Sequence, residues 1–125
     1  MSIDVAPLLL ALGRLLLGGL FVVGGLHHFF IIPQLTDAIA ARGVPFPRIV
    51  LIVGSVFQAV AGALLMLGFF VPAAALGLVV FTLLASVMLV NFWSLEGPAR
   101  ETASNVWKSN LAIVGGLLIA AAQAM

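Results

Sequence analysis

The sequence predicts an all-α integral membrane protein, a four-helix bundle with up-down-up-down topology and short loops. Of its 125 residues, 64% are hydrophobic and only 7% are charged. A soluble domain is usually about half apolar and about a quarter charged, so a water-soluble surface is not expected here. The hydrophobic residues form four runs, and each run meets the ~20 residues that one membrane-spanning helix requires.

The four apolar runs define the expected helices of one domain that spans residues 1–125. Within lipid the backbone must satisfy its own hydrogen bonds, so we expect these runs to be helical despite their valines and isoleucines. Gly68 and Pro72 divide what would otherwise be one overlong span, and they predict a tight apolar turn. The expected helices cover about residues 6–30, 48–69, 72–93 and 106–124.

The other two connections are more polar. Residues 33–47 mix apolar and polar side chains in a pattern that fits a short interfacial helix or an ordinary loop. Residues 94–105 include Glu96 and Arg100 and form the most water-like stretch, so we expect a loop there. The beginning of the chain has Asp4 and no basic n-region, which predicts a retained helix rather than a signal peptide.

Basic residues predict the orientation. Arg42, Arg48, Arg100 and Lys108 lie at or near the first and third connections, whereas the opposite face has no basic residue unless Arg14 extends to it. The positive-inside rule then places these connections in the cytoplasm. Both termini are therefore expected outside the cytoplasm, in a protein of the cell (inner) membrane.

Composition excludes several classes of function. The chain has no cysteine, which excludes thiolate nucleophiles, CxxC sites and iron–sulfur clusters. Its net charge of +1 gives no electrostatic footprint for nucleic acid. Adjacent histidines, His27 and His28, point about 100° apart on a helix, and no carboxylate lies within a span, so we expect no metal site. No haem is evident either, since both histidines lie on one helix, although a haem shared across a homodimer is an alternative.

One end of the expected bundle gathers most of the polar side chains. They lie next to the first and third connections: His27, His28, Asn91, Trp93, Trp107, Lys108 and Asn110. Polar groups that converge within an apolar wall are typical of a ligand pocket. Simpler interpretations are also open, namely interfacial histidines, an aromatic belt of tryptophans and a lysine whose amine extends to the headgroups.

Arg14 is a basic residue inside the first span, where a charge is costly. It shares one helical stripe with Gly18, Gly25 and His28, and the small residues allow a neighbouring helix to approach closely. Arg14 and His28 are 14 residues apart, about 21 Å along a helix, so they belong to opposite ends of the bundle. Arg14 is either an anchor at the interface or a group with a specific role.

Polar residues inside the second and third spans include Gln58, Thr82 and Ser86. Gln58 has a glycine four residues away on each side, which is typical of a helix-packing stripe with an amide that bonds across the bundle. Thr82 and Ser86 are expected to bond to the preceding turn of their own helix. We therefore favour a structural role for Gln58 over a catalytic one.

The order of motifs along nearly the whole chain resembles that of a known family. The motifs are Arg14-Leu15, Gly24-Gly25-Leu26-His27, Gly62-Ala63-Leu64-Leu65-Met66-Leu67-Gly68, Asn91-Phe92-Trp93 and Ser109-Asn110-Leu111-Ala112 with Gly115-Gly116-Leu117. This order is similar to that of the DoxX family of small four-helix membrane proteins, related to the DoxD subunit of thiosulfate:quinone oxidoreductase. A lysine is common in the family where His27 stands, and a histidine where Asn91 stands.

The resemblance implies a redox-associated membrane subunit that binds quinone or a similar lipophilic ligand. With the polar cluster, it makes His28 the catalytic candidate, a hydrogen-bond donor and proton relay, because the pKa of histidine lies near neutrality. Asn91, Asn110 or Lys108 would orient the headgroup, beside His27, and Trp93 or Trp107 would wall the ring. Electrons would come from a partner protein, since the chain has no evident redox centre. The alternatives are a non-catalytic membrane anchor or assembly subunit, and a small transporter that works as a homo-oligomer.

Overall fold

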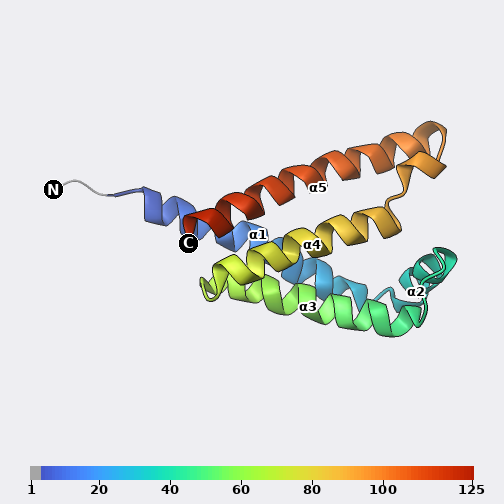
Figure 1. Ribbon diagram of the computed structural model, residues 1–125, viewed down its shortest axis with the longest axis horizontal. Coiled ribbons are helices and arrows are strands. Elements are labelled where there is room, and N and C mark those ends of the chain that lie inside the picture. The colour runs from blue at the N-terminus through green and yellow to red at the C-terminus, as the bar shows by residue number, and fades with distance from the viewer. Residues whose placement is uncertain (1–3) are drawn as a thin grey trace.

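The computed structural model describes residues 4–125, and within that range it contains helices and their connections but no strand. Four of the helices are long and apolar enough to cross a membrane. They run in alternating directions, so the predicted all-α membrane bundle with up-down-up-down topology is confirmed (Figure 1). The elements are α1 (Ala6–His28), α2 (Ile32–Ala41), α3 (Pro47–Leu67), α4 (Val71–Leu89), the 3₁₀ helix η1 (Phe92–Ser94) and α5 (Gly97–Gln123).

Several helix boundaries differ from the expected ones. All five α-helices have a proline in the first turn, where the missing amide hydrogen removes no helical bond. Pro98 therefore allows α5 to begin at Gly97 rather than near residue 106, and the expected loop 94–105 is mostly helical. Helix α4 ends at Leu89 rather than residue 93, and Trp93 lies in η1. Hydropathy marks the lipid-spanning part of a helix, whereas local backbone geometry determines where the helix begins and ends.

The turn between α3 and α4 is the tight apolar connection that Gly68 and Pro72 predict. Gly68 has a left-handed φ of 79°, and the Phe69 amide donates to the Leu64 carbonyl oxygen at 3.0 Å. This arrangement is a Schellman ending, in which glycine adopts a conformation that other residues avoid. Phe70 is also left-handed and directs the chain into α4.

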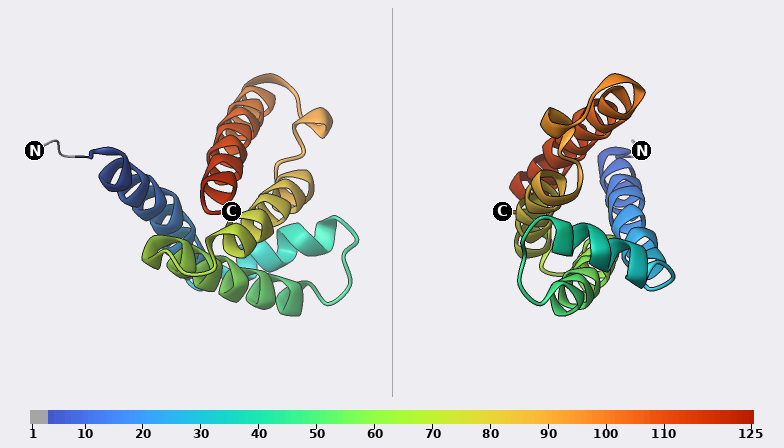
Figure 2. Two further views of the ribbon diagram at one scale, coloured as in Figure 1. Left: turned by 60° about the vertical axis from the view of Figure 1, so that its left-hand side comes forward. Right: turned by 90° about the vertical axis from the view of Figure 1, so that its right-hand side faces the viewer.

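The first polar connection contains α2, so the short-helix interpretation is correct and the ordinary loop is wrong. Ile39 is the buried residue of α2 and is only 3% exposed. Helix α2 packs against α3. It lies across the end of the bundle where α1 finishes and α3 begins (Figure 2).

Helices α1 and α3 approach closely through small residues. A Cβ added at Gly62 would lie 2.7 Å from the Gly18 carbonyl oxygen, and one added at Gly25 would lie 2.9 Å from the Ser55 carbonyl oxygen. Phe21 lies between these two crossings on the same stripe and is buried. The expected small-residue stripe of α1 therefore faces α3.

The buried core lies toward the α3–α4 turn, and the outer surface is strongly apolar. Leu16, Val23 and Ile119 are each about two-thirds exposed. An apolar surface of this extent is stable when it faces acyl chains rather than water. The core consists of Phe21, Ala61, Leu65, Val71, Ala74, Ala75, Leu78, Leu117 and Ala121.

Candidate functional site

A cavity of about 640 Å³ lies between α1, α3 and α4, on the side of the bundle where α2 lies. We call it the central cavity. Its volume falls within the range that is usual for small-molecule sites, about 300–1,000 Å³. It is open between α3 and α4, because the lining residues Ile49, Val53 and Leu84 are about 60% exposed. Most of its wall is apolar, and its polar lining residues are His28, Ser55, Gln58, Thr82, Ser86 and Asn110.

The first polar side of the central cavity is formed by α1 and α3. His28 is the last residue of α1, and its Nδ1 lies 2.9 Å from the Ser55 hydroxyl oxygen. Either atom can donate in this bond, depending on the tautomer. In both cases the bond fixes the ring and leaves Nε2 available for another partner.

Gln58 joins the same two helices one turn further along α3. Its Nε2 donates to the Phe21 carbonyl oxygen at 3.1 Å, and its side chain is buried. The contact depends on a glycine in α1, since a Cβ at Gly24 would lie 2.8 Å from that nitrogen. Gln58 therefore packs helices together, as the sequence indicates, and also lines the central cavity.

The second polar side is formed by α4 and α5. Asn110 donates from Nδ2 to the Ser86 hydroxyl oxygen at 2.8 Å, and that hydroxyl donates to the Thr82 carbonyl oxygen at 2.6 Å. The Ser86 bond to its own preceding turn is as expected. Asn110 thereby ties α5 to α4 beside the cavity.

The Thr82 hydroxyl, unlike that of Ser86, does not bond to the preceding turn of its own helix. The Thr82 side chain is buried, and its Oγ1 has no hydrogen-bond partner among residues 4–125. A buried polar group without a partner costs about 1–3 kcal/mol, so such a group points to a ligand or water in the adjacent space. The expected bond from Thr82 to its preceding turn is not formed.

The structure brings only some of the predicted site residues to the central cavity. His28 and Asn110 line it, whereas His27 and Lys108 are exposed and Asn91 lies beyond the end of α4. Among residues 4–125 no three His, Asp or Glu side chains come together as a metal ion would require. The central cavity can thus offer hydrogen bonds, but not a metal-ligand set, from the described residues.

The two tryptophans form a separate aromatic cluster. Phe92, Trp93 and Trp107 contact one another edge to face, with ring centroids 5.4–6.2 Å apart. The Trp107 indole nitrogen donates to the Val90 carbonyl oxygen. The Arg100 guanidinium lies 5.9 Å from the centroid of the Phe92 ring. This cluster holds η1 against α5 and does not line the central cavity.

Sequence reasoning missed Ser55, the residue that orients His28. Ser55 precedes Gln58 by three residues and Gly62 by seven, so helical spacing alone places it on the same stripe of α3. That spacing was available from the sequence. The pairing of Ser55 with His28 could not be read from the sequence, because it depends on how α1 and α3 are positioned along each other.

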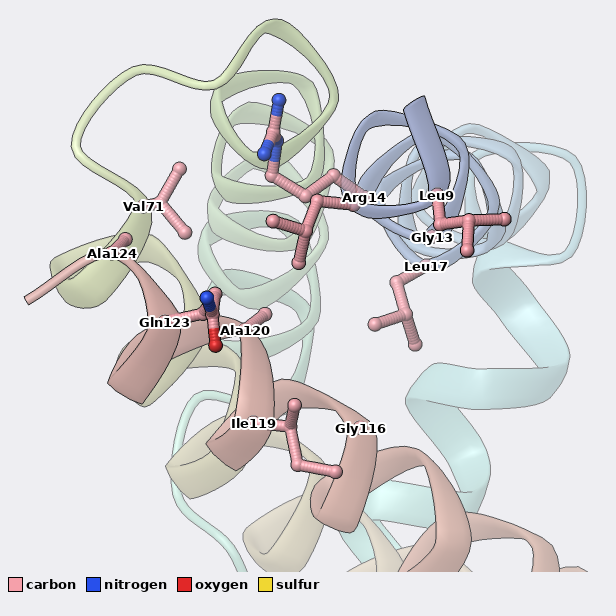
Figure 3. A pocket seen from close by; sticks show the side chains of 11 residues that line it. Leu9, Gly13, Arg14, Leu17, Val71, Gly116, Ile119, Ala120, Gln123 and Ala124 are labelled. Carbon is pink, nitrogen blue, oxygen red and sulfur yellow. The ribbon is translucent and has the colours of Figure 1, made fainter. Parts of the chain in front are cut away.

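Arg14 lies at the opposite end of the bundle from His28, as expected. It lines a smaller cavity of about 310 Å³ between α1 and α5, together with Gln123, and we call this cavity the Arg14 groove (Figure 3). A Cβ at Gly68 would lie 3.4 Å from Arg14 Nη2, which places the guanidinium beside the end of α3.

Comparison with known proteins identifies the family. Residues 9–91 match the DoxX family model. The chain belongs to the DoxX family. It is also 28% identical over 116 residues to the inner membrane protein YphA of Escherichia coli (strain K12). The aligned residues make up 92% of this chain and 82% of that protein. No solved structure matches.

The DoxX assignment confirms the resemblance that the sequence motifs carry. With the four apolar spans and the inner-membrane relative, it supports an integral inner membrane protein. The matched residues run from α1 to the end of α4. Asn110, which α5 contributes to the central cavity, lies beyond them.

Proposed function

We propose that this DoxX-family protein binds a quinone, or a similar lipophilic ligand with carbonyl oxygens, in the central cavity. The Thr82 hydroxyl, which none of the described residues bonds, is the observation that carries the proposal, because Thr82 lines a cavity with polar groups on two sides. A quinone has the matching shape and chemistry, an apolar ring with hydrogen-bond acceptors at opposite edges. The apolar walls and the open side between α3 and α4 suit such a molecule.

The chain offers several donors to such a ligand. The Thr82 hydroxyl has no partner among residues 4–125, and the amides of Gln58 and Asn110 each have a second hydrogen beyond the bond already made. His28 presents Nε2, because Ser55 occupies Nδ1. We assign His28 to hold or pass a proton at Nε2, and the other three residues to orient the ligand.

A bound quinone would supply the redox chemistry, accepting two electrons and two protons in a full reduction. The chain has no cysteine and no tyrosine, so we propose that the electrons come from a partner protein. His28 is half-buried and lies one residue from the exposed His27. A proton can therefore reach His28 from the end of the bundle without crossing the apolar core.

We also propose an orientation for the bundle. Arg42 directly follows α2, Arg48 lies in the first turn of α3, and Arg100 and Lys108 lie in the first half of α5. Under the positive-inside rule this end faces the cytoplasm and both termini lie outside it. The central cavity then lies nearer the cytoplasmic end.

Quinone retention tests the proposed ligand. The protein is purified gently, extracted with organic solvent and analysed by mass spectrometry for quinone per protein. His28→Ala is compared with His27→Ala, a neighbour that does not line the cavity. Thr82→Val is compared with Thr36→Val. The Thr36 hydroxyl is likewise buried with no partner in the described part of the chain, but it lies on α2 outside the cavity.

We expect stoichiometric quinone in the wild type and both controls, and less quinone per protein in His28→Ala and Thr82→Val, whose affinity should fall about tenfold, as for one lost hydrogen bond. Quinone at the bulk-membrane ratio in the wild type, or equal retention by all variants, would refute the proposal. Either result would favour the non-catalytic anchor, and co-purification of a stable partner would then be the measurement to make.

A further inference from the structure

The Arg14 groove has a composition that the proposed quinone site does not explain. It lies between α1 and α5, and its walls are apolar apart from Arg14 and Gln123. Figure 3 shows the Arg14 side chain leaving α1 and reaching toward the turn after α3, with Gln123 on the α5 side. A cation beside an apolar groove is the feature that requires an explanation.

The Arg14 guanidinium is not neutralised by the described residues. Its Nε is buried and has no hydrogen-bond partner among residues 4–125, and no carboxylate in that range forms an ion pair with it. The guanidinium lies beside Gly68, at the end of α3, where the last carbonyl groups of the helix offer only a partial negative charge. A guanidinium has five donors, so most of its hydrogen-bonding capacity is available to a ligand.

The depth of Arg14 in the bundle also indicates what that ligand is. Arg14 lies eight residues into α1, but it is level with the end of α3, the start of α4 at Val71 and the end of α5 at Gln123. The first turns of α1 extend beyond the other helices (Figure 1). In a bilayer the ends of spanning helices lie at the headgroup level, so the guanidinium lies there too.

We propose that the Arg14 groove binds an anionic phospholipid, with the phosphate on Arg14 and an acyl chain between α1 and α5. Guanidinium and phosphate match as a bidentate pair, and a cation without a counter-ion favours a ligand with net negative charge. Leu17 and Ile119 supply apolar wall, and Gly13 leaves room because a Cβ there would meet no atom within 4 Å. A soluble phosphate has the same oxygens but would leave this wall facing water.

Lipid-dependent thermal stability tests the proposal in the purified, delipidated protein. The additions are dioleoylphosphatidylglycerol, dioleoylphosphatidylcholine and inorganic phosphate. Arg14→Gln removes the charge, and Arg48→Gln removes an exposed cation from the other end of the bundle as a control. Native mass spectrometry counts the phospholipid that remains bound to each variant.

We expect phosphatidylglycerol to raise the Tm of the wild type and of Arg48→Gln, with an apparent affinity about tenfold weaker in Arg14→Gln. Phosphatidylcholine is expected to act more weakly, and inorganic phosphate not at all. Equal binding of phosphatidylglycerol by Arg14→Gln and the wild type would overturn the site. An Arg14-dependent response to inorganic phosphate would overturn the lipid and show a site for a soluble anion.

A second pair of variants keeps Arg14 and blocks the groove instead. Gly13→Leu fills the groove, whereas Gly19→Leu adds the same side chain to α1 where a Cβ also meets no atom within 4 Å, outside the groove. We expect Gly13→Leu to lose bound phosphatidylglycerol and Gly19→Leu to keep it. Retention by both would show that no acyl chain occupies the groove. Quinone content should stay at the wild-type level in all of these variants, since the two cavities lie at opposite ends.

Discussion

The crossing of α1 and α3 at Gly18 and Gly62 should govern the stability of the bundle. A Cβ at Gly18 would lie 2.9 Å from the Met66 backbone nitrogen, and one at Gly62 would lie 2.7 Å from the Gly18 carbonyl oxygen. An ordinary contact begins near 3.4 Å, so Gly62→Ala must separate the helices by about 0.7 Å. Backbone atoms cannot move aside as a flexible side chain can.

Overpacking of this kind costs about 1–3 kcal/mol, and the contacts with backbone atoms keep Gly18→Ala away from the low end of that range. We expect a loss of about 2 kcal/mol, roughly a 30-fold change in the unfolding equilibrium. The assay is loss of helical circular dichroism as SDS is titrated into detergent-solubilised protein. Gly19→Ala is the matched control, because a Cβ at this adjacent glycine would meet no atom within 4 Å.

The double variant sharpens the test. Once Gly18→Ala has separated the helices, Gly62→Ala enters space that is already open, so the pair should cost less than the sum of the single variants. Equal unfolding midpoints for Gly18→Ala and Gly19→Ala would refute the reasoning. So would strict additivity in the double variant, since the two glycines would then act independently.

Two further predictions concern the polar end and the orientation. Trp107→Phe should lower the free energy of unfolding by about 1 kcal/mol in a thermal melt, because it removes the bond to the Val90 carbonyl oxygen. Trp93→Phe, whose indole makes no hydrogen bond among residues 4–125, should cost less, and equal losses would contradict this account. In the cysteine-free chain, Ser94→Cys should react with an impermeant maleimide only from the cytoplasmic side, and Ala124→Cys only from outside. The reverse labelling pattern would overturn the proposed orientation.

Hydropathy and turn chemistry were enough to predict the fold. A bilayer restricts an apolar run of this length to a helix, and Gly68 determines where α3 must stop. Helix ends outside lipid were less predictable, because water can satisfy a backbone whether or not it is helical. The start of α5 at Gly97 and the end of α4 at Leu89 therefore follow from local geometry that composition does not encode.

The candidate site was predictable by residue type but not by pairing. His28 and Asn110 were correctly expected at one end of the bundle, and they do line one cavity. Whether Thr82 bonds to its own helix or faces a cavity depends on rotamer and packing, which hydropathy does not contain. The tryptophans were grouped with the site because they flank the same connection, but edge-to-face packing on Phe92 keeps them outside it.

The open side of the central cavity, between α3 and α4, determines how binding should be measured. A molecule that enters past Val53 and Leu84 comes from the acyl-chain region, not from bulk water. The relevant concentration is then the mole fraction of ligand in the leaflet. At a fixed total amount of a strongly partitioned ligand, halving the lipid doubles that fraction and raises occupancy. A Kd expressed per volume will therefore change with the amount of lipid or detergent, whereas one expressed per lipid will stay constant.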